Sequence, residues 1–281
     1  MKKDLILIVG ASGTVGSEIT KALKLQGYQV RVTTSKSVNA NDKDTVHINL
    51  ATGEGIKAAL DGVDRAFFLS PPGYADQYRL LSPLIQEAKR KGLKKVVLMT
   101  AMGANAVETS PFRRAELELE KSGINYNIIR PNWFLQNFNT FWIQGIKEQR
   151  KILLPAGKAK VSFIDARDIA AVASTLLTSD NLNNRAFDLT GPEAVDHEQV
   201  AKAISQVTNK NISYQEIEPD VLRSGLLAAG LPADYSDFLL MILSFLKEGY
   251  NASVNENVKF ILGREPKNLA QYAHDFKQSW L

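Results

Sequence analysis

Short apolar runs alternate with amphipathic stretches along the first half of the chain. The runs predict six strands, at residues 5–10, 28–34, 45–50, 63–70, 94–100 and 124–131. Apolar positions at helical spacing predict helices between them, at residues 14–27, 53–62, 78–92 and 111–123. Strands that alternate with helices of this length form parallel sheets with right-handed crossovers, and nearly continuous apolar strands suit a sheet covered on both faces. The pattern therefore predicts an α/β fold, a Rossmann-type doubly wound parallel sheet.

The alternation becomes less regular after residue 131. We expect one helix over residues 133–149, strand-like pieces at 151–156 and 160–164, and a helix from about Asp168. The remainder is mostly helical, with an extra strand at 211–218. We predict an NAD(P)-binding Rossmann domain over residues 1–150. Residues 151–281 should complete the sheet and form a smaller, mostly helical substrate lobe over the carboxyl ends of the strands, where such sheets bind ligands.

Three glycines follow the first predicted strand and open the first predicted helix. Their spacing, G-x-x-G-x-x-G, lets the backbone turn tightly and approach a pyrophosphate, to which a helix N-terminus offers free N–H groups. A tight turn without a ligand is the alternative, but the position at the first strand–helix junction favours the dinucleotide. The residues assigned to the cofactor here are Gly10, Ser12, Gly13, Thr14, Val15 and Gly16.

The end of the second predicted strand bears on the choice between NAD and NADP. An NAD site requires an Asp or Glu about 20 residues beyond the glycines, to bind the ribose 2′-hydroxyl. Residues 32–36 read VTTSK and contain no acid. The hydroxyls of Thr33, Thr34 and Ser35 and the cation of Lys36 suit a 2′-phosphate, so we expect NADP(H) to be preferred over NAD(H). A polar loop that merely lacks an acid is the alternative, and the reach of Arg31 stays open.

Composition narrows the possible functions. The 281 residues include no cysteine, which excludes disulfides and thiol catalysis, and three histidines far apart, which give no support to a metal site. The net charge is +4, and the basic run at residues 89–95 suits a helix C-terminus better than a nucleic-acid groove. The apolar run near the N-terminus is too short for a signal peptide or a membrane helix. We therefore expect a cytoplasmic protein that binds neither nucleic acid nor membranes.

Three motifs in order resemble a known family: VGASGTVG (residues 9–16), RPNWFLQNF (130–138) and VSFIDARDIAAVA (161–173). Together they are similar to the NmrA-like branch of atypical short-chain dehydrogenases, and within it to bacterial NAD(P)H:quinone reductases and triphenylmethane reductases. The similarity covers nearly the whole chain. It implies further dinucleotide contacts after the second to sixth strands, from Thr34, Ser35, Lys36, Asn49, Leu69, Ser70, Pro71, Thr100, Ala101, Pro131 and Asn132. Asn49 stands where the family often has an Asp near the adenine.

One departure from the wider family concerns the proton donor. Typical short-chain dehydrogenases carry Tyr-x-x-x-Lys at the start of the helix after the fifth strand. The matching positions here are Phe112 and Glu116, so the catalytic residue is unknown. The polar residues nearby are Arg113, Arg114 and Glu116. Their alternative role is a helix first turn and an exposed face, which we expect for at least one of the arginines. A standard alcohol dehydrogenase mechanism is not supported.

Five aromatic residues lie between residues 133 and 142. Phe134, Phe138, Phe141 and Trp142 fall at helical spacing and predict a core stripe. Trp133 and Asn137 lie on the adjacent flank, beside the expected nicotinamide; the alternative for Trp133 is that it caps the core. The residues assigned to the substrate pocket are Met102, Trp133, Phe134 and Asn137.

The features together favour an NADPH-dependent reductase that passes hydride to a quinone or another conjugated small-molecule acceptor. The alternative is a non-catalytic redox sensor that binds NADP(H), as some NmrA-like proteins do. The chain is expected to be a monomer or a homodimer.

Overall fold

The computed structural model describes residues 3–36 and 44–281, and the chain divides into two compact units. Unit 1 holds Met1–Pro72, Asp76–Pro131 and Ile169–Asp188, and unit 2 holds Gly73–Ala75, Asn132–Asp168 and Leu189–Leu281. This division differs from the expected boundary at residue 150. Residues 132–150 belong to unit 2 together with the following residues up to 168. The chain then returns to unit 1 and adds one more helix and strand to it.

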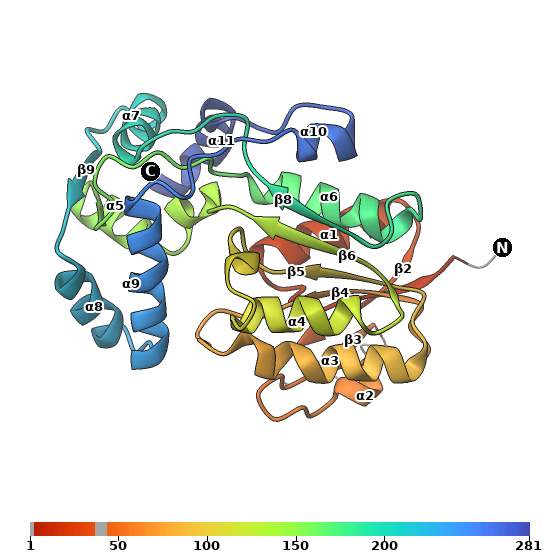
Figure 1. Cartoon of the computed structure of the whole chain (residues 1–281). Coiled ribbons are helices and arrows are strands. Elements are labelled where there is room, and N and C mark those ends of the chain that lie inside the picture. Colours follow the sequence, from red (N-terminus) through yellow and green to blue (C-terminus); the bar gives the residue numbers. More distant parts are fainter. Residues whose placement is uncertain (1–2, 37–43) are drawn as a thin grey trace. The chain divides into compact units, whose positions relative to one another are not determined.

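Unit 1 contains a seven-stranded sheet, which confirms the predicted fold class (Figure 1). Its strands are β1 (Leu5–Ile8), β2 (Gln29–Thr34), β3 (Thr45–His47), β4 (Arg65–Leu69), β5 (Lys95–Met99), β6 (Asn125–Pro131) and β8 (Arg185–Leu189). They lie in the order β3-β2-β1-β4-β5-β6-β8, and the pairs from β3 through β6 are parallel. The strand order reverses between β1 and β4, and ligands of doubly wound sheets bind at this kind of switch point.

Helices cover both faces of this sheet. They are α1 (Thr14–Leu25), α2 (Ile56–Ala59), α3 (Gln77–Lys91), α4 (Pro111–Glu120) and α6 (Ala166–Thr178), with a short 3₁₀ turn, η1 (Ala104–Ala106). Figure 1 shows α2, α3 and α4 on one face and α1 and α6 on the other. The face covered by α2, α3 and α4 holds a continuous apolar core, which includes Leu7, Phe68, Leu84, Val96 and Leu119. Burial of this apolar area holds the strands in place and so fixes the carboxyl edge of the sheet.

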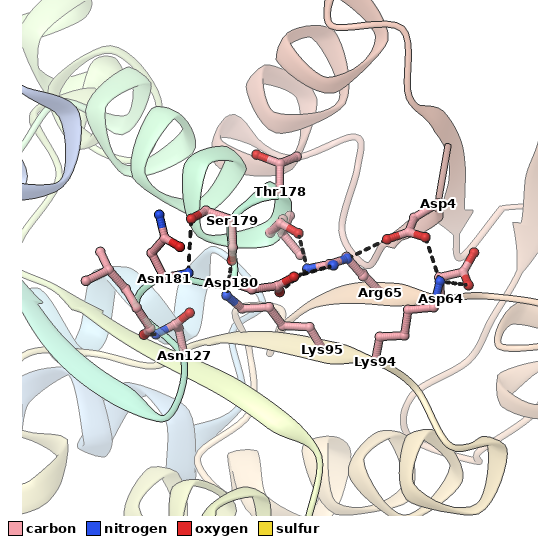
Figure 2. A network of polar contacts seen from close by, with 12 residues as sticks. Asp4, Asp64, Arg65, Lys94, Lys95, Asn127, Thr178, Ser179, Asp180 and Asn181 are labelled. Carbon is pink, nitrogen blue, oxygen red and sulfur yellow. Dashed lines mark hydrogen bonds and ion pairs between the residues drawn. The ribbon is translucent and has the colours of Figure 1, made fainter. Parts of the chain in front are cut away.

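A polar network ties the amino edge of the same sheet to α6 (Figure 2). Arg65 donates to the carbonyl of Leu177 at 3.1 Å and pairs with Asp180 at 2.8 Å. Lys95, which is fully buried, donates to the carbonyl of Ser179 at 2.6 Å. The last turn of α6 has no basic residue of its own, so cations from β4 and β5 satisfy its terminal carbonyls.

Unit 2 is mostly helical. Its elements are η2 (Leu135–Asn139), α5 (Ile143–Gln149), β7 (Lys151–Leu154), α7 (His197–Thr208), β9 (Ser213–Glu216), α8 (Pro219–Ala228), α9 (Ala233–Lys247), α10 (Asn257–Leu262), α11 (Leu269–Phe276) and η3 (Lys277–Trp280). β7 and β9 form a parallel pair. The helix expected over residues 133–149 is wrong, because the backbone breaks at Thr140 between η2 and α5. The strand-like piece expected at 160–164 forms no named strand but contributes two isolated bridges, from Val161 to Val195 and from Ile164 to Phe134.

The basic run that ends α3 is largely neutralised by acidic neighbours. Lys91 pairs with Asp61 at 2.7 Å, and Lys94 pairs with Asp4 at 2.7 Å and with Asp64 at 2.9 Å. The run therefore behaves as the predicted helix C-terminus. Among the helices in the described ranges, none has the length and apolar character to cross a bilayer.

Candidate dinucleotide site

The glycine turn joins β1 to α1, and two of its glycines are required by the fold itself. Gly10 has φ +74°, and a Cβ there would lie 3.0 Å from the Leu69 side chain. A Cβ on Gly16 would lie 2.3 Å from the Gly10 carbonyl oxygen, which is closer than any side chain allows. These two positions hold the start of α1 against the end of β1.

Gly13 is less constrained than these two glycines. Its φ is −84° and it is exposed, and a Cβ built there would lie 3.3 Å from the Gly10 carbonyl oxygen, a tight contact that a shift of a few tenths of an ångström would relieve. The fold therefore requires glycine less strictly at this position. Close approach of a ligand to the backbone of the turn would account for glycine here.

The first turn of α1 has the donors that an anion needs. Gly13 is its N-cap, and among the described residues no side chain caps this helix end. The first N–H groups of a helix have no carbonyl within the helix to bind, so those of Thr14, Val15 and Gly16 are available. The side chains of Ser12 and Thr14 are exposed beside them, whereas Val15 is buried and offers only its backbone.

The end of β2 presents fewer hydroxyls than the sequence suggested. Thr33 is buried, and its Oγ1 accepts a bond from the Gly10 N–H at 3.3 Å, so it braces the glycine turn. Thr34 is half-buried and its Oγ1 accepts from the Lys36 N–H at 3.1 Å, while Ser35 and Lys36 are exposed. Arg31 donates to the carbonyls of Ala59 and Asp61 at the end of α2, which answers the open question of its reach.

Loops after β3 and β4 lie at the same edge of the sheet. Asn49 uses its side-chain oxygen to accept from the N–H groups of Ala51 and Thr52, at 3.0 and 3.2 Å, so only its amide NH₂ remains for an adenine. The Leu69 side chain packs against Gly10. Ser70 and Pro71 follow it, both half-buried, and Ser70 Oγ donates to the Pro71 carbonyl at 3.3 Å.

The ends of β5 and β6 are joined through their backbones. Thr100 N–H donates to the Ile129 carbonyl, and Met102 N–H donates to the Pro131 carbonyl, both at 3.0 Å. Ala101 and Met102 are half-buried, whereas Thr100 and Pro131 are buried. Unit 1 thus brings the glycine turn and the ends of β2 through β6 to one edge of one sheet.

The remaining assigned residues belong to unit 2. Asn132 is buried, and its side chain binds Ser162 Oγ at 2.8 Å and the Asn251 carbonyl at 2.9 Å, so its amide supports this unit. Asn137 and Phe134 are half-buried. Phe134 forms a parallel bridge with Ile164.

The aromatic stripe is only partly a core. Phe138 is fully buried, but Phe141 is 49% exposed, because the chain breaks into two short helices and loses the expected helical face. Trp133 stacks on Trp142 with ring centroids 5.9 Å apart, and both pack against the unit 2 core. The alternative reading of Trp133 as a cap on the core therefore has structural support.

A buried ion-pair network surrounds Glu116, one of the two positions at which the sequence departs from the Tyr-x-x-x-Lys pattern. Glu116 is fully buried in α4, and its carboxylate accepts from Arg130 Nε and Nη2 at 2.9 and 2.7 Å. It also accepts from Thr100 Oγ1 at 2.7 Å and from Arg113 Nη1 at 3.1 Å. Burial alone would raise the pKa of Glu116, but the bonds from Arg130 and Thr100 outweigh it and hold the pKa below its ordinary value.

Arg114 is exposed, as expected for at least one of the two arginines, whereas Glu116 and Arg113 belong to this network. A signal for it was present in the sequence. Phe112, Ala115, Glu116 and Leu119 share one helical face, and the apolar members mark that face as buried. A carboxylate on such a face requires cationic partners. Phe112 itself packs against the core and offers no proton.

Within the described residues, no cluster of His, Cys, Asp or Glu side chains could hold a metal ion.

The fold and the glycine turn define a Rossmann-type protein with an uncapped helix N-terminus at its switch point. The chain belongs to the NmrA-like family, whose model matches residues 2–273. It is 32% identical to an uncharacterized oxidoreductase, YesF, of Bacillus subtilis, over 100% of this chain and 98% of the relative. It is 30% identical to an NAD(P)H azoreductase of Xenophilus azovorans, over 96% of each chain.

The solved structures support the fold. The NADPH-dependent quinone oxidoreductase QOR2 of Escherichia coli, complexed with NADPH, superposes with a TM-score of 0.77 at 20% identity, over 96% of this chain and 99% of that one. The predicted family resemblance is confirmed by these matches.

Proposed function

We propose that the protein is an NADPH-dependent reductase that passes hydride to a quinone or a similar conjugated acceptor. The observation that carries the proposal is Gly13, an exposed glycine with an ordinary φ at the uncapped start of α1, where a close-lying dinucleotide would leave no space for a side chain. The relatives named as an oxidoreductase and as an NAD(P)H azoreductase support the same class of reaction.

The residues of the turn fit a pyrophosphate. The N–H groups at the start of α1 would bind its oxygens, and the exposed hydroxyls of Ser12 and Thr14 would add donors. Ser35 and Lys36 would bind a 2′-phosphate, and the end of β2 has no carboxylate to repel it. A reduced nicotinamide dinucleotide supplies the hydride when bound.

The acceptor class follows from the proton donors that are missing. A ketone becomes an alkoxide as hydride arrives, so its reduction needs a positioned acid or a polarising group. Phe112 has no acidic proton, and Thr100 donates its own proton to Glu116. A quinone spreads the incoming charge over its ring and second oxygen, and its reduced form can take a proton from water. These residues therefore favour quinones over ketones.

The test combines binding with turnover. Calorimetric titration should give tighter binding of NADPH than of NADH, and Lys36→Ala should weaken NADPH while leaving NADH unchanged. Lys24→Ala, in the last turn of α1, is the matched control. Oxidation of NADPH should proceed with a simple quinone and fail with ketones and aldehydes.

Other outcomes would redirect the assignment. Efficient ketone reduction would reveal an unidentified acid and contradict the proposal. Tight NADPH binding without turnover of any acceptor would support the alternative, a sensor that holds NADP(H). Equal affinities for the two dinucleotides, with no effect of Lys36→Ala, would remove the NADP preference.

A further inference from the structure

Asn132 is a buried residue whose side-chain hydrogen-bonding capacity is fully used. It keeps 3% of its surface exposed. Its Nδ2 donates to Ser162 Oγ at 2.8 Å and to the Asn251 carbonyl at 2.9 Å. Its Oδ1 accepts from the Trp133 N–H and from Asn251 Nδ2, both at 2.9 Å. An amide has two N–H donors and two acceptor lone pairs, so this side chain has nothing left to offer a cofactor.

These bonds also fix the direction in which the amide points. The Trp133 N–H can only donate and the Asn251 carbonyl can only accept, so exchanging the oxygen and nitrogen of Asn132 would set like groups against each other. Ser162 Oγ accepts from Asn132, and the nearest acceptor for its own proton is the Ser253 carbonyl at 2.7 Å. The network is therefore directional, and it ends on the backbone of another segment.

That segment is residues 251–255, which we call the strap. It lies between α9 and α10 and forms no helix or strand, so its backbone groups depend on partners from other segments. At its far end, Thr190 Oγ1 accepts from the Asn255 N–H at 3.0 Å. Ser253 and Val254 are exposed between the two ends. The strap is thus clipped at both ends by side chains of unit 2.

The residues that clip the strap stand at the ends of two strands. Asn132 directly follows β6, and Thr190 directly follows β8. The Asn132 N–H donates to the Leu189 carbonyl at 2.9 Å, so the two strand ends meet. Ligands of doubly wound sheets lie beyond the carboxyl ends of the strands. Trp133, whose N–H is bound by Asn132, is one of the residues expected to line the acceptor pocket, so Asn132 ties an expected pocket residue to the strap.

We propose that Asn132 is a positioning residue, which clips the strap and fixes the backbone of Trp133 and thereby sets the place of the acceptor. The inference rests on the proposed function for the acceptor, a quinone or a similar conjugated molecule, whereas the clip stands on the hydrogen bonds alone. It replaces the cofactor contact that the resemblance implied for the side chain of Asn132.

The first test releases the strap by the mildest available change. Asn251→Ala removes one donor to Asn132 and leaves the backbone carbonyl in place, so the fold should survive. Hydrogen exchange measured by mass spectrometry should show peptides over residues 251–255 exchanging about tenfold faster, with peptides of α7 and α11 unchanged. Asn211→Ala, at an exposed asparagine of the same unit, is the matched control.

Asn132→Ala should release the same peptides further, because it removes four bonds rather than one. The double variant with Asn251→Ala should exchange no faster than Asn132→Ala alone, because the two side chains share their bond. Unchanged exchange of the strap in both single variants would overturn the clip. Faster exchange spread evenly over unit 2 would overturn it too, because the amide would then only support the fold.

The second test concerns the acceptor. In Asn251→Ala the KM for a simple quinone should rise about fivefold, while kcat and the Kd of NADPH stay within about twofold of wild type. Thr190→Val releases the end of the strap that Asn132 does not hold, and it should raise the quinone KM less. A purely structural role would reduce the amount of active enzyme, and therefore the apparent kcat, without raising KM.

The kinetic outcomes separate this inference from the proposed function. A released strap with an unchanged quinone KM would overturn the positioning role and leave quinone reduction standing. A weaker affinity for NADPH in Asn251→Ala would also overturn it, because the clip would then serve the cofactor. If wild type reduces no acceptor, the proposed function falls and the positioning role falls with it, while hydrogen exchange still decides whether the clip exists.

Discussion

At the scale of single residues, the three glycines of the turn do different work. Gly16 has no space for a side chain, because its Cβ would lie 2.3 Å from a backbone oxygen. Gly13 has an ordinary φ of −84°, and its Cβ would meet the Gly10 carbonyl oxygen at 3.3 Å, a contact that a small shift would relieve. The fold and the proposed dinucleotide would then place separate demands on neighbouring positions of one motif. The two demands can be measured separately.

We predict that Gly13→Ala keeps the fold and loses the ligand, while Gly16→Ala loses the fold. Gly13→Ala should change the free energy of unfolding by less than about 1 kcal/mol and weaken NADPH at least tenfold, because the new methyl occupies the approach to the turn. Gly16→Ala should cost several kcal/mol or prevent soluble expression, because the backbone must shift. Urea unfolding and calorimetry measure both effects. If Gly13→Ala binds NADPH as tightly as wild type does, the dinucleotide does not lie close to the backbone at Gly13.

His197 makes a second residue-scale prediction. It is fully buried in unit 2, and its ring lies against Phe163 and Tyr214, with centroids 5.6 and 5.3 Å away. Neither ring nitrogen has a hydrogen-bond partner among the described residues. Burial lowers the pKa of His197 to about 4. In the unfolded chain the His197 imidazole therefore binds a proton as the pH falls through about 6.5. In the folded protein the same group stays neutral until about pH 4.

Stability should consequently fall as the pH drops from about 6.5 toward 4, by about 1.4 kcal/mol per pH unit from this group. His197→Phe removes the titration and should flatten that part of the profile. His274→Gln is the matched control, because the His274 side chain is 75% exposed. Urea unfolding at pH 7 and pH 5 compares the three proteins. If the stability of His197→Phe falls with pH as steeply as that of wild type, other groups cause the acid sensitivity.

At the scale of elements, α6 is held at its C-terminus by strands far away in sequence (Figure 2). Arg65 reaches Leu177 and Asp180 from β4, and its Nε also binds Asp4 at 2.7 Å. Its side chain is only 11% exposed, whereas that of Asp180 is 63% exposed. The helix that returns the chain to unit 1 is thus bound at its end by a half-buried arginine.

We predict that Arg65→Met destabilises the protein by about 2–3 kcal/mol, because it leaves the Leu177 carbonyl and Asp180 without their donor. Lys259→Met is the control: it removes an exposed pair with Glu265 and should have no measurable effect. Thermal and urea unfolding provide the comparison. Equal effects of the two substitutions would show that the Arg65 network adds no more than a surface pair.

Elements also show how far the sequence could lead. The six strands of the first half were predicted to within three residues, because each is a short apolar run bounded by polar or glycine-containing segments. The segment after residue 131 was not, because its aromatic residues fit one helical face although the backbone turns at Thr140. Local periodicity does not report such a break. The glycine turn was visible in the sequence, while the inward bond of Thr33 depends on the pairing of β2 beside β1.

At the scale of the whole molecule, the two units are interleaved along the chain. Unit 1 needs α6 and the start of β8 from residues 169–188, and unit 2 takes up residues 132–168 before them. The sequence suggested a boundary at residue 150, at the end of the helix expected over residues 133–149. Long-range contacts, such as those of Arg65 and Lys95, decide which unit α6 joins. The hydrophobic periodicity of the sequence does not reveal such contacts.

This interleaving predicts that residues 1–150 do not fold alone. Such a fragment would lack α6 over one face of the sheet and β8 beside β6, and it would expose the buried edge of β6. It would also leave Lys95 without its carbonyl partner. The apolar residues between 135 and 146 would lose the rest of the unit 2 core, against which they pack. We expect the fragment to aggregate. Co-expression with residues 151–281 should restore a soluble complex, because the break falls at the exposed Arg150, between α5 and β7, and leaves both elements intact. Gel filtration and circular dichroism of the fragment and of the co-expressed halves test this. A soluble fragment 1–150 with a cooperative thermal transition would show that the first six strands form an independent domain after all.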